Sequence, residues 1–327
     1  MAQKQANLKS IPLDKLLAGH VTTENDLVSA CQENGFFYLD FRHPSTCEIL
    51  QHVDECAVIG KEVFKLPLKE KEEYSTEKYL PSRLFGYKRA GCSVGPMAKK
   101  SDGYESFSIH NNGIFGLEDM VCPPAIDENL ALFQTFMSKS HDYCECILST
   151  LSKALKLPYD LRDCHRKDKP SAANMAMLKY LPWGSNNDKV GNMAHTDMGT
   201  LTVVFSKSDG LQAMLPGDDE WSFIPPRVGH AVVNVGDSLR FLSNGALASS
   251  LHRVVPPPDS QGQDKFSVIY FLRPELDARF TAHDGKQMSS IEWHNQKYAL
   301  FRESSVDARK HGAILTGRKD YLGTKVQ

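Results

Sequence analysis

The stretch Ala194-His195-Thr196-Asp197-Met198-Gly199-Thr200-Leu201-Thr202-Val203-Val204-Phe205 decides how the rest of this chain is interpreted. One residue separates His195 from Asp197, and the segment then runs into β-branched and apolar residues. Side chains at positions i and i+2 of a strand point to the same face. The spacing therefore predicts an imidazole and a carboxylate side by side at the start of a strand, aimed at one point.

Such a pair holds a metal ion only if a third ligand arrives from elsewhere in the chain. The candidate is His252, in Ser250-Leu251-His252-Arg253-Val254-Val255. Two imidazoles and one carboxylate on one face leave three coordination positions open, which is the arrangement of non-haem Fe(II) oxygenases. An isolated His-x-Asp pair is more often an ordinary hydrogen-bonded pair. The metal hypothesis therefore depends on the surrounding sequence.

The composition is that of an ordinary globular protein: of 327 residues, 41% are hydrophobic and 24% are charged. The net charge of -2 argues against nucleic acid or an anionic membrane as the main partner. We expect no membrane span, because no apolar run approaches the ~20 residues that one needs. Eight scattered cysteines without a Cys-x-x-Cys pair, and no signal-peptide pattern at residues 1–9, predict reduced thiols in a cytoplasmic protein.

The hydrophobic pattern changes from helical to β along the chain. Apolar residues recur at helical spacing over residues 126–157. Between Asn174 and Pro274, short apolar strands alternate with turn signals, which is typical of an antiparallel sandwich or jelly roll. After Phe280 the tail becomes helical again. Residues 79–121 are broken by Gly and Pro, and such irregular loops often border a site.

These patterns predict a mixed α+β fold with a jelly-roll core. We expect an N-terminal helical or mixed region at residues 1–160 that packs on the core, the core itself at residues 161–275, and a C-terminal helical segment at residues 276–327.

Several motifs then follow one another in order: His195-Thr196-Asp197, Gly210-Leu211-Gln212, Val233-Asn234-Val235-Gly236-Asp237, Leu242-Ser243-Asn244-Gly245 and His252-Arg253-Val254-Val255. In this order they resemble the 2-oxoglutarate and Fe(II)-dependent dioxygenase superfamily, in its isopenicillin N synthase-like branch. Ile11-Pro12, Ala30-Cys31 and Gly35-Phe36-Phe37 resemble the N-terminal region of that branch. The resemblance covers roughly residues 10–275.

The resemblance implies a double-stranded β-helix with His195, Asp197 and His252 as iron ligands. The separation from first to last ligand, 252 − 195 = 57 residues, fits two opposed edges of such a jelly roll. The implied cofactors are Fe(II), 2-oxoglutarate as co-substrate, and O2. The implied reaction decarboxylates 2-oxoglutarate to succinate and oxidises a C–H bond of a small molecule. Hydroxylation, desaturation, and rearrangement or ring expansion remain open.

Two motifs depart from the family pattern. The family binds the distal carboxylate of 2-oxoglutarate with Arg-x-Ser, and this chain has Lys265-Phe266-Ser267. Lys265 and Ser267 share a face by the period of two, but lysine lacks the bidentate fork of arginine. The family often has Asn-x-Tyr before the first metal histidine, where this chain has Leu178-Lys179-Tyr180. The resemblance therefore assigns 2-oxoglutarate binding to Lys265, Ser267 and Tyr180, with Leu178 as a pocket wall.

Substrate contacts are expected from position relative to these motifs. The candidates are Arg89, Tyr104, Phe107, Phe205, Leu247 and Trp293. The tail from Arg273-Pro274 to Trp293 resembles fungal members of natural-product pathways, which suggests an aromatic or polyketide-like substrate and a role in secondary metabolism.

Three alternatives stay open at this point. Because lysine replaces arginine in the Arg-x-Ser motif, the protein could instead be an Fe(II) oxidase of the same fold that does not use 2-oxoglutarate. The same ligand set could bind Zn²⁺ and activate water, as in a zinc hydrolase, although no general base is obvious nearby. A non-catalytic jelly-roll binding protein would keep the three residues only as a relic.

Overall fold

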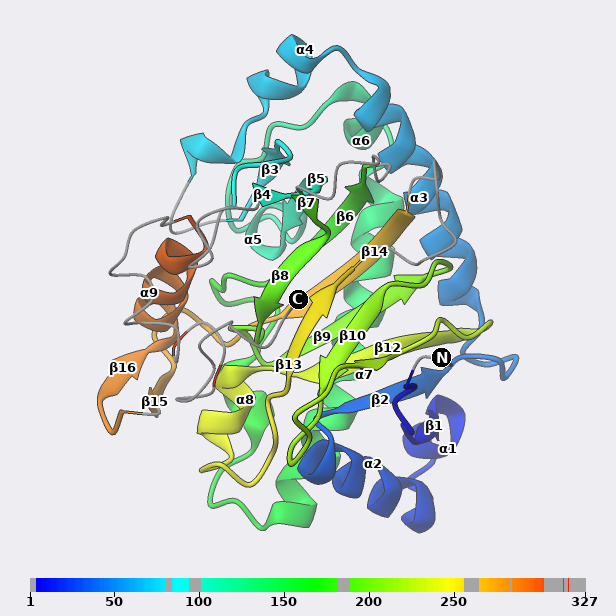
Figure 1. Ribbon diagram of the computed structural model, residues 1–327, viewed down its shortest axis with the longest axis vertical. Helices are drawn as coiled ribbons and strands as arrows, with labels where there is room; N and C mark the ends of the chain where they lie inside the picture. Colours follow the sequence, from blue (N-terminus) through cyan, green and yellow to red (C-terminus); the bar gives the residue numbers. More distant parts are fainter. Residues whose placement is uncertain are drawn as a thin grey trace.

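The computed structural model describes residues 4–79, 84–93, 101–181, 189–255, 265–282 and 284–302, together with residues 314 and 317. Within these ranges the chain forms two facing sheets with helices packed around them (Figure 1).

The large sheet has the strand order β1-β2-β12-β9-β14-β6-β5-β3. Its pairings are antiparallel except that between β1 and β2. In that order the bounds are β1 (Ser10–Pro12), β2 (Phe36–Asp40), β12 (His230–Val235), β9 (Leu201–Ser206), β14 (Lys265–Leu272), β6 (Asn174–Tyr180), β5 (Tyr104–His110) and β3 (Gly86–Lys88).

The small sheet has the order β11-β10-β13-β8. Its strands are β11 (Ser222–Phe223), β10 (Leu211–Met214), β13 (Leu251–Val254) and β8 (Asn192–His195). The two sheets enclose a cavity lined by side chains from both. Two short pairs lie outside them, β4 (Ser101–Asp102) with β7 (Lys189–Val190) and β15 (Arg279–Thr281) with β16 (Gln287–Ser289).

Helices cover the large sheet on the face away from the small sheet (Figure 1). α3 (Glu48–Lys65) and α7 (Leu130–Leu155) both contact β14. The buried residues of α7 recur every three or four positions, and the helix ends where Lys156 takes a left-handed conformation with φ 51°. The other helices are α1 (Leu13–Leu17), α2 (Val21–Glu33), α4 (Leu68–Glu73), α5 (Asn111–Ile114), α6 (Pro124–Asp127), α8 (Asp237–Leu242), α9 (Ser290–Arg302) and the short 3-10 helices at Thr76–Lys78 and Leu161–Cys164.

This architecture confirms the predicted mixed α+β fold with a jelly-roll core. The division of the chain at residues 160 and 275 stays a prediction. The structure adds that residues before 160 contribute β1, β2, β3 and β5 to the large sheet. Among the described residues, no helix combines the length and the apolar character needed to cross a bilayer.

Candidate metal centre and active-site pocket

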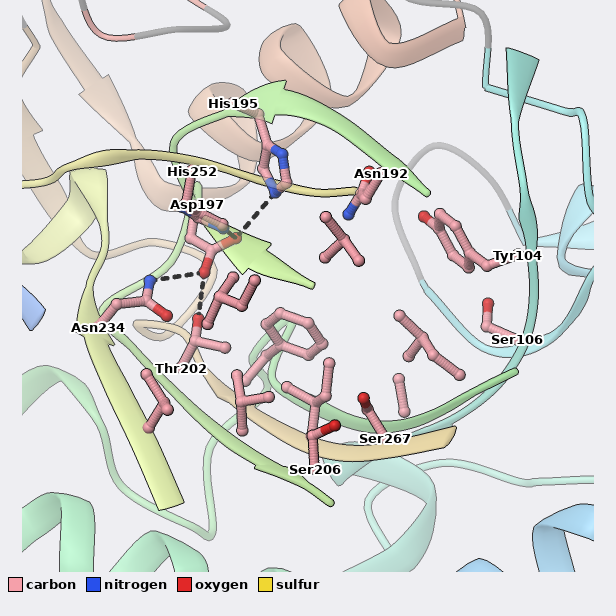
Figure 2. A pocket seen from close by; sticks show the side chains of 18 of the residues that line it. Tyr104, Ser106, Asn192, His195, Asp197, Thr202, Ser206, Asn234, His252 and Ser267 are labelled. Atoms are coloured by element: carbon pink, nitrogen blue, oxygen red, sulfur yellow. Dashed lines mark hydrogen bonds and ion pairs between the residues drawn. The ribbon is translucent and has the colours of Figure 1, made fainter. Parts of the chain in front are cut away.

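Three side chains from two strands and a loop converge at one end of the cavity (Figure 2). The Nε2 atoms of His195 and His252 lie 3.5 Å and 3.7 Å from Oδ1 of Asp197. His195 ends β8 and His252 lies on the paired strand β13, where the two residues face each other in register. Among the described residues this trio is the one group of His, Cys, Asp or Glu side chains with the spacing of a metal site.

Hydrogen bonds to backbone carbonyls orient both imidazoles. Nδ1 of His195 donates to the carbonyl of Met193 at 2.6 Å, and Nδ1 of His252 donates to that of Ser250 at 3.2 Å. A carbonyl only accepts, so the proton of each neutral ring is on Nδ1. Nε2 of each ring therefore keeps a free lone pair directed toward Asp197, as metal-ligating histidines require. Burial lowers the pKa of His252 to about 4, which keeps it neutral near pH 7.

The carboxylate of Asp197 is held through its other oxygen. Oδ2 accepts hydrogen bonds from Thr202 Oγ1 at 2.6 Å and from Asn234 Nδ2 at 2.8 Å. Burial alone would raise the pKa of Asp197, but the interactions of its carboxylate, among them the hydrogen bond from the amide of Asn234, outweigh burial and hold that pKa far below its usual range. Asp197 is thus an oriented anion, and Oδ1 faces the histidines.

The expectation that His195 and Asp197 begin one strand is wrong. His195 ends β8, and Asp197 lies in a loop before β9 begins at Leu201. The loop is held by the start of α8, because the backbone amides of Asp237 and Ser238 donate to the carbonyls of Asp197 and Gly199 at 2.8 Å and 3.0 Å. The two side chains therefore meet because of tertiary hydrogen bonds and not because of strand periodicity.

The alternation of strand residues decides which side chains reach the cavity. On strands β5, β6, β9, β12 and β14 of the large sheet, alternate residues line the cavity and the residues between them point toward the helices. The inward sets are Tyr104, Ser106 and Ser108 on β5; Thr202, Val204 and Ser206 on β9; and Lys265, Ser267, Ile269 and Phe271 on β14.

The three residues expected to bind 2-oxoglutarate all line this cavity. Lys265 lies opposite Tyr180 in the pairing of β14 with β6, and Ser267 lies opposite Leu178, which also lines the cavity. Nζ of Lys265 donates to the carbonyls of Ser208 and Asp209 at 2.7 Å and 2.9 Å. Burial lowers the pKa of Lys265 to about 8. No carboxylate among the described residues forms an ion pair with it.

Of the residues expected to contact substrate, Tyr104 lines the cavity and the others lie elsewhere. Tyr104 lines the cavity, where its ring centroid lies 5.4 Å from that of Tyr180. Phe107 and Phe205 belong to the hydrophobic core instead, because each has the opposite parity on its strand. Phe205 packs there against Phe136 of α7, with ring centroids 6.0 Å apart.

The other three candidates also lie away from the cavity. Leu247 is in the core, and Trp293 packs edge-on against Phe241 with ring centroids 5.0 Å apart. Arg89 has a side chain that is 61% exposed and lies 3.6 Å from Glu72 on the surface.

Sequence reasoning missed the residues through which α9 reaches the cavity. Tyr298 and Phe301 line it, and the ring of Phe301 meets that of His195 edge-on with centroids 5.3 Å apart. Tyr298 and Phe301 are three apart, and Trp293 lies on the core-facing side of the same helix. The helical spacing in this tail was the available signal, but it does not tell which stripe faces a cavity.

Comparison with known proteins agrees with this geometry. Residues 172–274 match the family model of the 2OG-Fe(II) oxygenase superfamily, and residues 11–119 match that of the N-terminal region of non-haem dioxygenases in morphine synthesis. The chain is 33% identical to a 2-oxoglutarate-dependent dioxygenase of Gibberella zeae, over 98% of this chain and 95% of the relative. It is 36% identical to the 2-oxoglutarate-dependent dioxygenase gloE of Glarea lozoyensis, over 96% and 93%.

The fold matches that of a full-length Neurospora crassa protein whose crystal structure is a complex with alpha-KG. The TM-score is 0.74 at 22% identity, over 91% of this chain and 99% of that one. The two relatives match nearly the whole chain, the family models match residues 11–119 and 172–274, and the buried two-histidine, one-carboxylate set suits Fe(II). This protein therefore belongs to the 2-oxoglutarate and Fe(II)-dependent oxygenase superfamily and is a non-haem dioxygenase.

Proposed function

We propose that His195, Asp197 and His252 are the Fe(II) ligands of this dioxygenase and that it oxidises a C–H bond of a small molecule. The observation that carries the assignment is the convergence of two Nε2 atoms on one carboxylate oxygen, with every other polar atom of the trio already hydrogen-bonded. The bound iron supplies the oxidising chemistry with O2 and 2-oxoglutarate. The chain supplies the fixed ligands, the polar groups that orient the co-substrate, and the apolar walls that exclude water.

Lys265, Ser267 and Tyr180 are proposed to hold the distal carboxylate of 2-oxoglutarate. Support comes from the buried ammonium group, which has two carbonyl acceptors and no carboxylate partner among the described residues. A buried cation is stable only when a charged or polar partner compensates it. The hydroxyl of Ser267 points into the same cavity (Figure 2).

The substrate is proposed to be an aromatic or polyketide-like molecule of secondary metabolism. Tyr104, Tyr298 and Phe301 give the cavity an aromatic wall, and such side chains favour planar ligands. The relatives from Gibberella zeae and Glarea lozoyensis are named as 2-oxoglutarate-dependent dioxygenases, which supports the reaction class.

The test measures succinate and CO2 from anaerobically prepared Fe(II) protein that receives 2-oxoglutarate and then air, in wild type and in His195→Ala. Enzymes of this class usually turn over slowly without their substrate, so we expect Fe(II)-dependent succinate that disappears in His195→Ala. Absence of succinate, together with no perturbation of the Fe(II) spectrum by 2-oxoglutarate, would contradict the proposal.

The hydrolase alternative gains no support from the cavity. Asp197 is the only carboxylate among the described residues that line it, and that side chain belongs to the metal trio. A metal-bound water would therefore find no second carboxylate to act as its general base.

A further inference from the structure

A fully buried ion pair lies beside the metal centre and is used by none of the roles assigned so far. Lys297 of α9 is 0% exposed, and its Nζ forms an ion pair with Oδ2 of Asp237, the first residue of α8. The same Nζ donates to Thr196 Oγ1 at 2.6 Å, and Thr196 Oγ1 in turn donates to Asp237 Oδ2 at 3.1 Å. Thr196 is the residue between the two ligands His195 and Asp197.

Asp237 also contacts the other ligand-bearing segments. Its second oxygen, Oδ1, accepts from Ser249 Oγ at 2.8 Å, three residues before His252. Its backbone amide donates to the carbonyl of Asp197 at 2.8 Å. A single aspartate therefore ties together the segments that carry all three ligands, and the lysine that neutralises it comes from the C-terminal helix.

The same helix lines the active-site cavity. Tyr298 follows Lys297 directly, and Phe301 lies four residues after it and contacts the ring of His195. Anchoring α9 at Lys297 therefore fixes one wall of the cavity relative to the ligands.

Removing one partner of a buried ion pair costs far more than removing both, because the remaining charge has no compensation. Without Lys297, the carboxylate of Asp237 would stay buried beneath the ligand loop, and its partners among the described residues would be the hydroxyls of Thr196 and Ser249. The loop would then have to move to hydrate it, and the ligands are part of that loop.

We propose that Lys297 is a positioning residue for the metal centre, acting through Asp237 and Thr196 to hold the segment from His195 to Asp197. This inference rests on the proposed ligand role of His195, Asp197 and His252.

The test compares Fe(II) dissociation constants, measured anaerobically by chelator competition, in full-length variants whose folding is checked by circular dichroism. Lys297→Met should weaken Fe(II) binding about tenfold, the lower end of what outer partners of metal ligands contribute. Lys297→Met combined with Asp237→Asn should recover most of that loss, because no buried charge remains. Thr196→Val keeps the ion pair and should weaken Fe(II) binding by a few fold. If Lys297→Met does not fold, the Fe(II) dissociation constant of Thr196→Val tests the proposed positioning role.

A matched control comes from a second buried ion pair away from the metal. Nζ of Lys71 on α4 lies 2.7 Å from Oε2 of Glu105 on β5, and the two side chains are 9% and 8% exposed. Lys71→Met should lower the melting temperature as Lys297→Met does, yet leave the Fe(II) dissociation constant unchanged.

The outcomes separate this inference from the proposed function. If the wild type fails to bind Fe(II), or if His195→Ala binds it equally well, the ligand assignment itself is wrong. If the wild type binds Fe(II) normally and neither Lys297→Met nor Thr196→Val weakens binding, only the role of Lys297 is overturned. Equal losses in Lys71→Met and Lys297→Met, or no recovery in the double variant, would also overturn it.

Discussion

Two buried lysines, Lys297 and Lys265, show how similar side chains can serve different purposes. Lys297 has its own carboxylate partner in Asp237. Nζ of Lys265 donates to two backbone carbonyls and has no carboxylate partner among the described residues, and the side chain lines the cavity. A buried ammonium group that the protein has already neutralised is part of the framework. A buried ammonium group that has no carboxylate partner among the described residues can instead bind an anionic ligand.

The largest expected effect comes from removing each ammonium group in turn, which tests whether the two lysines have different roles. Lys265→Met should weaken 2-oxoglutarate binding about 10- to 100-fold, the range expected from a lost charge-assisted hydrogen bond, and leave Fe(II) binding unchanged. Lys297→Met should mainly affect Fe(II). Calorimetric titration of both ligands checks this, with Lys265→Arg as the charge-preserving control. Equal effects of both variants on both ligands would show that the two lysines do not differ in role.

The second prediction concerns the hydrogen bonds on Asp197. Asn234→Leu removes the amide that donates to Oδ2 at 2.8 Å. We expect Fe(II) affinity to fall about tenfold, because outer partners orient metal ligands. Chelator competition measures the change, and 2-oxoglutarate binding to the fully loaded protein should stay within about twofold of wild type. Unchanged Fe(II) affinity would mean that Thr202 alone orients the carboxylate.

The third prediction sharpens the assignment of Lys265 through pH. Burial lowers its pKa to about 8, so its amine is charged below that pH and loses its proton above it. The bound co-substrate favours the charged form, so 2-oxoglutarate affinity should be highest below pH 8. It should then fall by at most tenfold for each further pH unit. Lys265→Arg stays charged and should show no such fall between pH 7 and 9.5. Parallel profiles for the two proteins would assign the titration to another group.

The smallest expected effect tests the two faces of β5. Phe107→Leu should lower the free energy of unfolding by roughly 1 kcal/mol and leave the binding of both ligands unchanged, because Phe107 is in the core. Tyr104→Leu should alter substrate specificity with little loss of stability, because Tyr104 lines the cavity. Thermal melts and turnover with candidate aromatic substrates separate the two. A change of ligand affinity in Phe107→Leu would contradict the assignment of the two faces.

The fold class and the identities of the candidate ligands were predictable from residue patterns alone. Periodicity of two and of 3.6 is a local property, so the strands of the core and the long helix α7 were readable from apolar spacing. The motifs around His195 and His252 were recognisable because each is a short segment of chain. The same local rule also showed that Lys265 and Ser267 share a face, and the cavity lies on that face.

Long-range packing determines which face of each strand meets the cavity and which residues support the candidate metal centre. Parity says that Ser106 and Phe107 point to opposite sides, but it does not say which side is the cavity, and so Phe107 and Phe205 were misplaced. The contact of Lys297 with Asp237 joins residues 60 apart in sequence. No local sequence pattern predicts such a contact, because it forms only when α9 packs beside the segment from His195 to Asp197.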